Sequence, residues 1–409
     1  MGVPKLRFAG FSDHYETKTM MDVCKINQGL QIPISERLTT PSSNCHFYIT
    51  NEFLKEGSSK KYYIENAAST VICDDNDLLM TRTGNTGTVV KNVRGVFHNN
   101  FFKIKCNNLV LKDFLYYFLV LEKTQRLILK LAGTSTIPDL NHGDFYSIEI
   151  SLPTISEQIK ITQFLIAIDE KISLLNKEYK LLYQYKKGMM QKIFNQELRF
   201  KDENGDVYSA WKIKPLKELY TLLNTNSLSR SELNYESGNI KNIHYGDIHT
   251  KFNGRFDITK ELVPYISKTI KIAEECYCRK GDLVIADASE DYNDIGKCIE
   301  ITNVNQQQVV AGLHTFLARP NTTMALGFGS YMMQSSEVRR QIKVIATGVS
   351  VLSITKKNLL ELMIPLPSID EQTKIANFFS ALDDKVAVKK AELDKLKTWK
   401  QGLLQQMFV

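Results

Sequence analysis

Several features that mark large classes of proteins are missing from this chain of 409 residues. Its longest uninterrupted apolar run, Phe114 to Leu121, is too short for a membrane span, which needs about 18 apolar residues. Its first residues, Met1-Gly2-Val3-Pro4-Lys5-Leu6, match neither a secretion signal nor a myristoylation signal. These absences exclude the common membrane and export classes, so we expect a cytoplasmic protein without membrane contact.

Cysteine and proline are also used sparingly. The seven cysteines are scattered, only Cys276 and Cys278 lie close together, and no C-x-x-C occurs, so we expect free thiols rather than a disulfide or zinc framework. The chain has no Pro-Pro pair and therefore lacks the Asn/Asp-Pro-Pro-aromatic tetrapeptide of amino-methyltransferases. It also lacks the G-x-x-x-x-G-K-[ST] phosphate loop and the G-x-S-x-G nucleophile motif. We expect no catalytic residue, no metal site and no cofactor in this chain.

Charge alone decides little. The net charge of +7 permits binding to nucleic acid but does not by itself indicate it. Two acidic stretches, Asp169-Glu170-Lys171 and Asp383-Asp384-Lys385, could suggest a nuclease. Both lie within a helical pattern and off its apolar positions, which favours a solvated helix face.

A long internal repeat organises the chain. Residues 152–194 recur as residues 366–408 at a constant offset of 214, without a gap and with 17 identities in 43 positions. Each copy opens with Leu-Pro, then an acidic and capping stretch that suits a helix N-terminus, and closes with Lys-x-Gly-x-x-Gln-x-x-Phe. A gapless repeat of this length indicates a repeated structural unit.

Each copy has apolar residues at alternating spacings of four and three, which is the heptad pattern of a coiled coil. A helix over Ile161–Ile193 would be roughly 50 Å long at about 1.5 Å per residue. Lys186, Lys389 and Lys400 interrupt the pattern. We expect the two apolar seams to cover each other. The predicted seam residues are Ile161, Leu165, Ile168, Ile172, Leu175, Leu182, Met189, Ile375, Phe379, Leu382, Val386, Leu393, Leu396 and Leu403.

The segments before the two helices repeat less closely. Leu6-Arg7-Phe8 is echoed by Leu198-Arg199-Phe200, and Tyr15 by Trp211. We align 48–51 with 244–247 and predict strands at 77–80 and 282–285, with further strands near 88–90 and 298–301. One helix is expected near 112–130 and one near 326–345, followed by strands at 148–152 and 362–366. The plan is globular, helical, globular, helical.

Two similar globular domains held apart by a regular helical pair suit the reading of a divided DNA site, since half-sites about one helical turn, ~34 Å, apart lie on one face of the duplex. Polar loops after the predicted strands supply short donors, acceptors and cations. As a set that recurs in both halves, they fit DNA contact and ordinary solvated loops equally well. The candidate DNA-contacting residues are Lys60, Lys61, Tyr62, Tyr63, Thr81, Arg82, Thr83, Asn85, Lys91, Thr134, Ser135, Thr136, Tyr245, Asp247, Lys251, Arg255, Ser289, Tyr292 and Ser350.

Four features together carry a family resemblance: the Leu-Pro-x-Ile-x-Glu-Gln-x-Lys-Ile helix start, the Gly281–Ile285 strand, the Arg82–Asn85 loop and the closing Lys-x-Gly-x-x-Gln-x-x-Phe. With them the chain resembles the specificity subunit of type I restriction–modification systems over nearly its whole length. One departure concerns the loop 288–296, which is acidic and lacks the Arg-Thr-Gly-Asn form. A carboxylate there could accept a hydrogen bond from a cytosine amino group instead of contacting phosphate.

The resemblance implies an α+β protein in which two α/β target-recognition domains are joined by two long helices that form an antiparallel intramolecular coiled coil with a pseudo-twofold repeat. The predicted parts are 1–151, 152–197, 198–365 and 366–409. It also implies a non-catalytic, cytoplasmic subunit whose partners are double-stranded DNA, two methyltransferase subunits and restriction/translocase subunits. Those partners, and not this chain, would use S-adenosylmethionine, ATP and magnesium.

Two other classes remain open from the residues alone. An enzyme with an unrecognised nuclease or methyltransferase site would show activity as an isolated chain with magnesium or S-adenosylmethionine. A coiled-coil adaptor without DNA readout would show no sequence-selective binding at a stated salt concentration.

Overall fold

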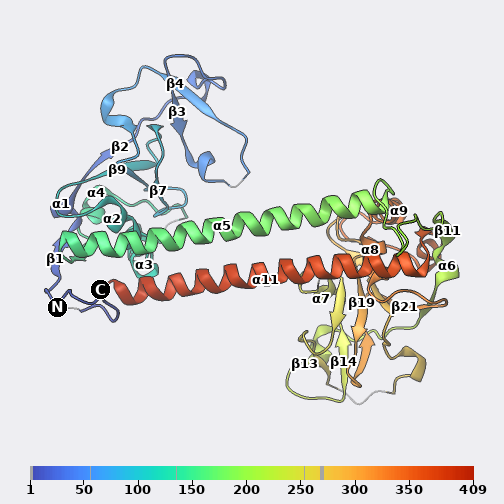
Figure 1. Ribbon diagram of the computed structural model, residues 1–409. Coiled ribbons are helices and arrows are strands. Elements are labelled where there is room, and N and C mark those ends of the chain that lie inside the picture. The colour runs from blue at the N-terminus through green and yellow to red at the C-terminus, as the bar shows by residue number, and fades with distance from the viewer. Residues whose placement is uncertain (1–2, 56, 135, 253, 268–270) are drawn as a thin grey trace. The chain divides into compact units, whose positions relative to one another are not determined.

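The computed structural model describes residues 3–55, 57–134, 136–252, 254–267 and 271–409. The chain divides into two compact units, of which unit 1 contains residues 1–176 and 391–409 and unit 2 contains residues 177–390. Of each of the two long helices, α5 (Ile155–Phe194) and α11 (Ile369–Met407), one end belongs to unit 1 and the other end to unit 2 (Figure 1). The predicted boundaries, which give each helix a segment of its own, stay a prediction.

Unit 1 contains two four-stranded sheets and one strand pair. The sheets have the orders β2-β9-β6-β7 and β4-β3-β8-β5, and β1 pairs with β10. The predicted strand at 77–80 is β6, and the one near 88–90 is β7. The strands are β1 Glu16–Thr19, β2 Cys24–Gln28, β3 Cys45–Ile49, β4 Tyr62–Glu65, β5 Ile72–Cys73, β6 Leu78–Thr81, β7 Val89–Lys91, β8 Gly95–Phe97, β9 Phe101–Cys106 and β10 Glu149–Leu152.

The short helices of unit 1 lie beside these sheets. They are α1 Met20–Val23, η1 Ile34–Glu36, η2 Asn51–Leu54, η3 Ser69–Val71, α2 Lys112–Leu119, α3 Glu122–Leu131 and α4 His142–Tyr146. The single helix predicted near 112–130 is wrong, because the backbone is extended at Leu121 (φ −59°, ψ 138°) and separates α2 from α3. The break lets α2 and α3 each bury its own apolar face.

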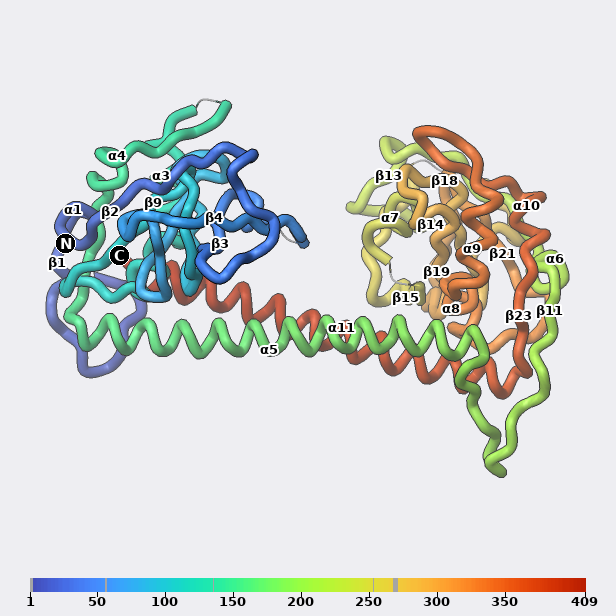
Figure 2. Tube along the Cα trace, turned by 90° about the horizontal axis from the view of Figure 1, so that it is seen from above, coloured from blue at the N-terminus to red at the C-terminus, as the bar shows by residue number. Residues whose placement is uncertain are grey.

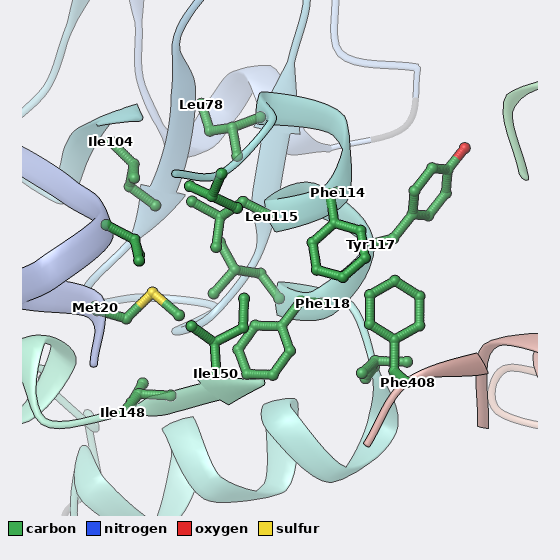
Figure 3. Close-up of a cluster of buried hydrophobic side chains, with 14 of the residues drawn as sticks. Met20, Leu78, Ile104, Phe114, Leu115, Tyr117, Phe118, Ile148, Ile150 and Phe408 are labelled. Carbon is green, nitrogen blue, oxygen red and sulfur yellow. The ribbon is translucent and has the colours of Figure 1, made fainter. Parts of the chain in front are cut away.

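The main core of unit 1 lies between the β2-β9-β6-β7 sheet, α2 and the ends of the two long helices. Met20, Leu78, Ile104 and Ile150 are buried there together with side chains of α5 and α11. Figure 3 shows Phe408 from the C-terminal segment beside Phe114 of α2, with ring centroids 4.9 Å apart. Residues more than 290 positions apart in sequence thus share one apolar cluster.

Unit 2 repeats this arrangement, and one of its two main sheets has an additional strand. A five-stranded sheet has the order β12-β21-β17-β19-β15, and a four-stranded sheet has the order β13-β16-β14-β20. β11 and β23 lie side by side at one edge, as Figure 2 shows, and β18 pairs with β22. The strands are β11 Lys212–Pro215, β12 Tyr220–Leu223, β13 Leu233–Asn234, β14 Ile240–Ile243, β15 Arg255–Asp257, β16 Tyr265–Ile266, β17 Leu283–Ala286, β18 Ala288–Ser289, β19 Cys298–Asn303, β20 Gln308–Ala311, β21 Thr315–Pro320, β22 Leu352–Ser353 and β23 Met363–Leu366.

The helix predicted near 326–345 is divided like its counterpart in unit 1. Ser335 is extended, and its hydroxyl accepts a hydrogen bond from the backbone N–H of Val338, so a new helix starts there. The helices of unit 2 are α6 Leu216–Leu219, η4 Arg230–Glu232, α7 Tyr245–Thr250, η5 Glu274–Cys276, α8 Phe328–Gln334, α9 Ser336–Ile345 and α10 Lys356–Leu360.

The two units also correct the alignment of their early strands. β3 ends at Ile49 and β14 ends at Ile243, and each residue pairs in parallel with the next strand of its sheet. Thr50 and His244 follow, and the side chain of each accepts a backbone N–H at the start of a short helix. Thr50 therefore corresponds to His244, which shifts the predicted alignment of 48–51 by two residues.

Within each unit, α5 and α11 lie against each other and run in opposite directions. In unit 1 the rings of Phe164 and Trp399 are 6.1 Å apart. In unit 2 Glu178 contacts Lys389 at 3.4 Å, and Lys186 contacts Asp383, so residue numbers rise along one helix as they fall along the other. The predicted antiparallel helical pair is confirmed.

The predicted seam is buried where other elements also cover it. Ile161, Leu165 and Ile168 are buried in unit 1, and Ile375, Phe379 and Leu382 are buried in unit 2. Two helices alone cover a seam only in part, so the remaining positions are half-buried except for Leu393 and Leu403. The half-buried seam residues are Ile172, Leu175, Leu182, Met189, Val386 and Leu396.

Candidate functional site

A buried ion pair fixes the start of α5 in unit 1. Glu157 has no exposed surface, and both of its carboxylate oxygens accept hydrogen bonds from Arg7, at 2.8 and 2.7 Å. The hydroxyl of Tyr15 donates to the same carboxylate at 3.0 Å. Burial is the main cause that raises the pKa of Tyr15, and the negative charge of Glu157 raises it further. The N-terminal segment is thereby tied to the helix start.

Unit 2 repeats this buried ion pair with equivalent residues, and we call each of the two pairs the Arg–Glu clamp. Arg199 donates to both oxygens of the fully buried Glu371, at 3.1 and 2.6 Å, and the indole N–H of Trp211 donates at 2.9 Å. Glu157 and Glu371 therefore do more than place negative charge at a helix N-terminus. The repeated arginine, the repeated glutamate and the Tyr15/Trp211 position contact one another in each unit, although in the sequence they appear as separate repeats.

The glutamine that follows each buried glutamate accepts a hydrogen bond from the segment that leads into a shorter helix of the same unit. Gln158 accepts a hydrogen bond from the backbone N–H of Leu111 at 2.9 Å, just before α2. Gln372 accepts one from Ala325 at 3.1 Å, shortly before α8. Backbone donors at a helix N-terminus need such partners. The Glu-Gln pair of the repeated motif is thus a scaffold feature in both units.

Asp169 and Asp383 were expected on a solvated helix face, and the structure corrects this. In unit 1 Asp169 accepts from Lys400 at 2.5 Å and from the hydroxyl of Tyr117 at 2.7 Å. In unit 2 Asp383 accepts from Lys186 and from Tyr331, the latter at 2.7 Å. Lys186 and Lys400, two of the three lysines that interrupt the heptads, are the partners of these aspartates.

The polar loop after β6 in unit 1 is held by a hydrogen bond within the loop and by hydrogen bonds to Pro138 and Asp139. Thr81 is fully buried and its hydroxyl donates to the carbonyl of Asn85 at 2.6 Å. Arg82 donates to both oxygens of Asp139, at 2.9 and 2.6 Å, and Thr86 donates to the carbonyl of Pro138 at 2.7 Å. Thr81 and Thr86 thus shape the loop, while Thr83 and Asn85 keep partly exposed side chains.

The acidic loop after β17 in unit 2 is instead bound to α9. Arg339 donates to the carbonyl of Asn293 at 2.8 Å, and Lys343 donates to the side-chain oxygen of Asn293 at 2.8 Å. The hydroxyl of Ser289, which is nearly buried, donates to the carbonyl of Asp291 at 2.9 Å. The two equivalent loops are therefore held by different contacts and present different chemistry.

A histidine and tyrosine cluster borders this loop. The ring of Tyr245 lies 6.1 Å from that of His249 and 5.3 Å from that of His314. His314 contacts Asp287, the residue that follows β17, at 3.2 Å between Nδ1 and Oδ1. Burial raises the pKa of Asp287, and the neighbouring His314 acts in the opposite direction.

Comparison with known proteins identifies the family. The model of the type I restriction modification DNA specificity domain matches residues 12–184 and again residues 208–398. The chain belongs to this family. It is a specificity subunit of a type I restriction–modification system with two target-recognition domains, as the sequence predicted. The predicted α+β fold class is confirmed as well.

Individual relatives agree with this assignment. The chain is 25% identical over 372 residues to the type I restriction enzyme MjaVIII specificity subunit of Methanocaldococcus jannaschii, covering 87% of this chain and 84% of the relative. The crystal structure of the S subunit from M. genitalium has the same fold, with a TM-score of 0.61, 16% identity and coverage of 100% and 99%. A chain from a structure on assembly and conformational transition of the type I R-M system has a TM-score of 0.54 and 16% identity. The match covers 97% of this chain and 98% of that one.

The first target-recognition domain places its other predicted contact residues at two sites. Lys60 and Lys61 are exposed beside a pocket of about 370 Å³ that is also lined by Phe47, Phe53 and Tyr63. Thr134 and Thr136 are exposed on a separate loop, and Ser135 lies outside the described residues. Tyr62 is half-buried on β4. DNA contact by these residues stays a prediction.

Lys91, predicted to contact phosphate, also takes part in the packing of unit 1, and its contact with phosphate stays a prediction. It lies opposite Leu78 in the sheet, donates to Asp113 of α2 at 3.1 Å and stands 4.2 Å from the ring centre of Tyr116. In the second domain Glu300 holds the matching position opposite Leu283. A cation in one domain and a carboxylate in the other thus reach the start of the equivalent helix.

The remaining predictions fall in the second target-recognition domain. Arg255 contacts Asp384 of α11 at 3.1 Å, and Ser350 and Tyr292 are exposed. Asp247 is buried and contacts Lys251, both of them predicted, and also Arg230, which sequence reasoning missed. Arg230 starts the short helix η4 and belongs to none of the repeated motifs that the sequence analysis used.

Across the described ranges, no three or more His, Cys, Asp and Glu side chains come together as a possible metal site. Of the helices that the structure describes, none is long and apolar enough to cross a membrane. All seven cysteines are free thiols.

Proposed function

We propose that each target-recognition domain reads one half of a divided DNA target and that the paired helices set the spacing between the halves. The observation that carries this proposal is the combination of a scaffold that both units repeat with loops that differ between them. Both units repeat the Arg–Glu clamp and the Lys–Asp–Tyr contact. The loop after the equivalent central strand contains Arg82 paired with Asp139 in one unit and Asp287 paired with His314 in the other.

Different loop chemistry on one scaffold is what an asymmetric target needs. Sequence is read by groups that match the donors and acceptors on base edges, whereas phosphate contacts set position. Because donors and acceptors differ between the two loops, the two half-sites should differ in sequence.

We further propose that the helical pair docks methyltransferase subunits, one on each unit, and that restriction/translocase subunits join this complex. An exposed aromatic side chain recurs at equivalent places, Tyr185 in unit 2 and Trp399 in unit 1, with 52% and 49% exposure. Three residues later on each helix stands a glycine, Gly188 or Gly402. A face present twice fits two copies of one partner.

The two glycines support docking because the chain itself does not explain them. A Cβ at Gly188 or Gly402 would meet nothing within 4 Å apart from its chain neighbours and local helix backbone, as far as the described residues extend. Glycine inside a helix costs roughly 1 kcal/mol relative to alanine. Close approach of a partner at these points gives the glycines a reason.

Catalysis is assigned to the partners in this proposal. S-adenosylmethionine, ATP and magnesium would be used by the methyltransferase and translocase subunits, and this chain would have no activity of its own. The purified chain, incubated with DNA and magnesium or S-adenosylmethionine, should neither cut nor methylate. Activity of the isolated chain would favour an unrecognised enzyme instead.

Methylation profiling of the host genome tests the reading function. We expect a split motif with modified adenines that disappears when this chain is deleted. The purified chain or its complex with methyltransferase should then bind a duplex with that motif better than a scrambled duplex at the same salt concentration. Equal binding to both would leave only an adaptor role.

Docking has its own test in the glycines. Gly188→Ala and Gly402→Ala should leave the fold intact or stabilise it, because each adds a methyl group in open space. Each should weaken the association with methyltransferase, measured by titration. Unchanged association in both variants would place the docking face elsewhere.

A further inference from the structure

Two cations in unit 2 converge on one buried carboxylate. Arg230 donates from Nη1 and Nη2 to the two oxygens of Asp247, each at 3.1 Å, and Nζ of Lys251 lies 3.0 Å from Oδ1. The hydroxyl of Tyr235 accepts from Lys251 at 3.2 Å, and the Lys251 ammonium stands 5.4 Å from the centre of that ring. We call Arg230, Lys251 and Asp247 the cation pair site.

The geometry of this site leaves the cations available. The Asp247 side chain is 1% exposed, whereas those of Arg230 and Lys251 are 48% and 45% exposed. Nη2 of Arg230 and Nζ of Lys251 are 3.1 and 3.0 Å from the same oxygen and are therefore no more than about 6 Å apart. Two oxygens of one phosphate can bridge such a distance.

The site also keeps a net positive charge. Hydrogen bonds to Asp247 raise the pKa of Arg230 and the pKa of Lys251, so both stay charged, and together they outnumber the single carboxylate. Burial, with a further contribution from the charge of Arg230, lowers the pKa of His244, so that side chain is neutral near pH 7. The buried Asp247 holds the cations in place without cancelling them.

The cation pair site is continuous with the candidate reading loop. Asp247 and Lys251 belong to α7 or directly follow it, and Tyr245 at the start of α7 contacts the ring of His314. His249 of the same helix contacts the carbonyl of Ala288 at 2.9 Å. One short helix thus connects two exposed cations to the loop after β17.

Unit 1 has a different residue at the matching point. Because Thr50 corresponds to His244, the position three residues later is Phe53 in unit 1 and Asp247 in unit 2. Phe53 is 42% exposed and lines the aromatic pocket. The cation pair site is therefore a feature of the second target-recognition domain.

We propose that Arg230 and Lys251 together bind one backbone phosphate of the DNA half-site read by unit 2, and that Asp247 is a positioning residue that does not contact DNA. This inference rests on the proposed DNA-reading function. It assigns phosphate contact in a domain whose acidic loop gave no cation for that role. A guanidinium fork and an ammonium suit a phosphodiester, and backbone contacts fix the register in which base edges are read.

Salt dependence tests the inference in the methyltransferase complex, with a duplex that carries the motif found by methylation profiling. Each neutralised phosphate contributes about 0.9 to the slope of log Kd against log salt concentration. Arg230→Gln and Lys251→Met should each lower this slope, and because both cations bind one phosphate, the two changes together should lower it by at most about 0.9. Each change should weaken binding of the motif duplex and of the scrambled duplex by the same factor. The matched control Arg340→Gln removes an exposed arginine of α9 that pairs with Glu337, and should leave the slope unchanged.

Neutral methylphosphonate linkages, placed one at a time along the half-site, locate the contact. One position should weaken binding of the unsubstituted protein and have little effect on binding of the Arg230→Gln variant. Asp247→Asn should weaken binding and reduce the penalty at that same position, a result that a merely structural aspartate would not give. Thermal unfolding of each variant identifies loss of fold, and Arg230→Lys, which keeps the charge, should retain the slope.

The outcomes separate the two proposals. Failure of the unsubstituted complex to prefer the motif would overturn the reading function itself. Normal preference, with an unchanged slope in folded Arg230→Gln and Lys251→Met and equal penalties at every linkage, would overturn the cation pair site alone.

Discussion

Lys186 of α5 donates a hydrogen bond to Asp383 of α11, and Lys400 and Asp169 repeat this contact in the other unit with the roles of the two helices exchanged. Each aspartate also accepts from a tyrosine hydroxyl of its unit, Tyr331 or Tyr117. The interruption in each heptad is therefore part of the scaffold. A polar contact at one place in an apolar seam can also fix the relative register of two helices.

We expect Asp383→Asn to destabilise unit 2, because it leaves a mostly buried lysine without its anionic partner. The loss should be roughly 1–3 kcal/mol in the free energy of unfolding, the usual cost of an unsatisfied polar group. The double variant Lys186→Met with Asp383→Leu should lose less than the single changes combined. Denaturant unfolding measures both, and strict additivity would show that the two residues do not act together.

The Arg–Glu clamp should matter more than surface ion pairs. Arg199→Ala leaves the fully buried carboxylate of Glu371 without its cation, and removing one partner of a buried pair costs roughly 3–5 kcal/mol. Arg340→Ala, which breaks an exposed pair on α9, serves as the control and should change little. Similar losses in the two variants would contradict the structural role of the clamp.

Glu300 should make the stability of unit 2 depend on pH. Burial raises the pKa of Glu300 to about 7, although the backbone N–H groups of Gly327 and Ser330 donate to it. Between its ordinary pKa, near 4.5, and about 7, the folded protein holds a proton that the unfolded chain has released, so stability falls as pH rises through this window. Glu300→Gln should remove that slope, which unfolding at several pH values would measure, while Glu337→Gln should preserve it.

The apolar seam should not tolerate charge. Ile168→Asp in unit 1 and Leu382→Asp in unit 2 bury an unpaired carboxylate in a cluster of apolar side chains, so each should destabilise its unit by several kcal/mol, ~3 or more, and abolish assembly with methyltransferase. Leu174→Asp, at an exposed position of α5, should leave the free energy of unfolding nearly unchanged. Retained assembly after both buried changes would count against the seam.

The positions of the long helices and their antiparallel seam followed from sequence because they depend on local periodicity and a gapless repeat. Ile161 and Ile375 start equivalent heptads, and both are buried as predicted. The central strands β6 and β17 followed for the same reason, since short apolar runs after polar turns carry their own signal. The breaks at Leu121 and Ser335 were not predicted, although the Ser335 hydroxyl that caps the start of α9 is a local signal that the sequence contains.

The sequence by itself determined that this chain is a duplicated scaffold of strands and paired helices, because spacing and repetition survive without knowledge of contacts. Only the tertiary structure decided which charges are used inside that scaffold and which remain for a partner. Arg82, Lys91 and Asp169 look like surface charges in sequence, yet each is paired with a residue distant in the chain. Arg230 and Lys251 are 21 positions apart and meet only because one buried carboxylate, Asp247, holds both.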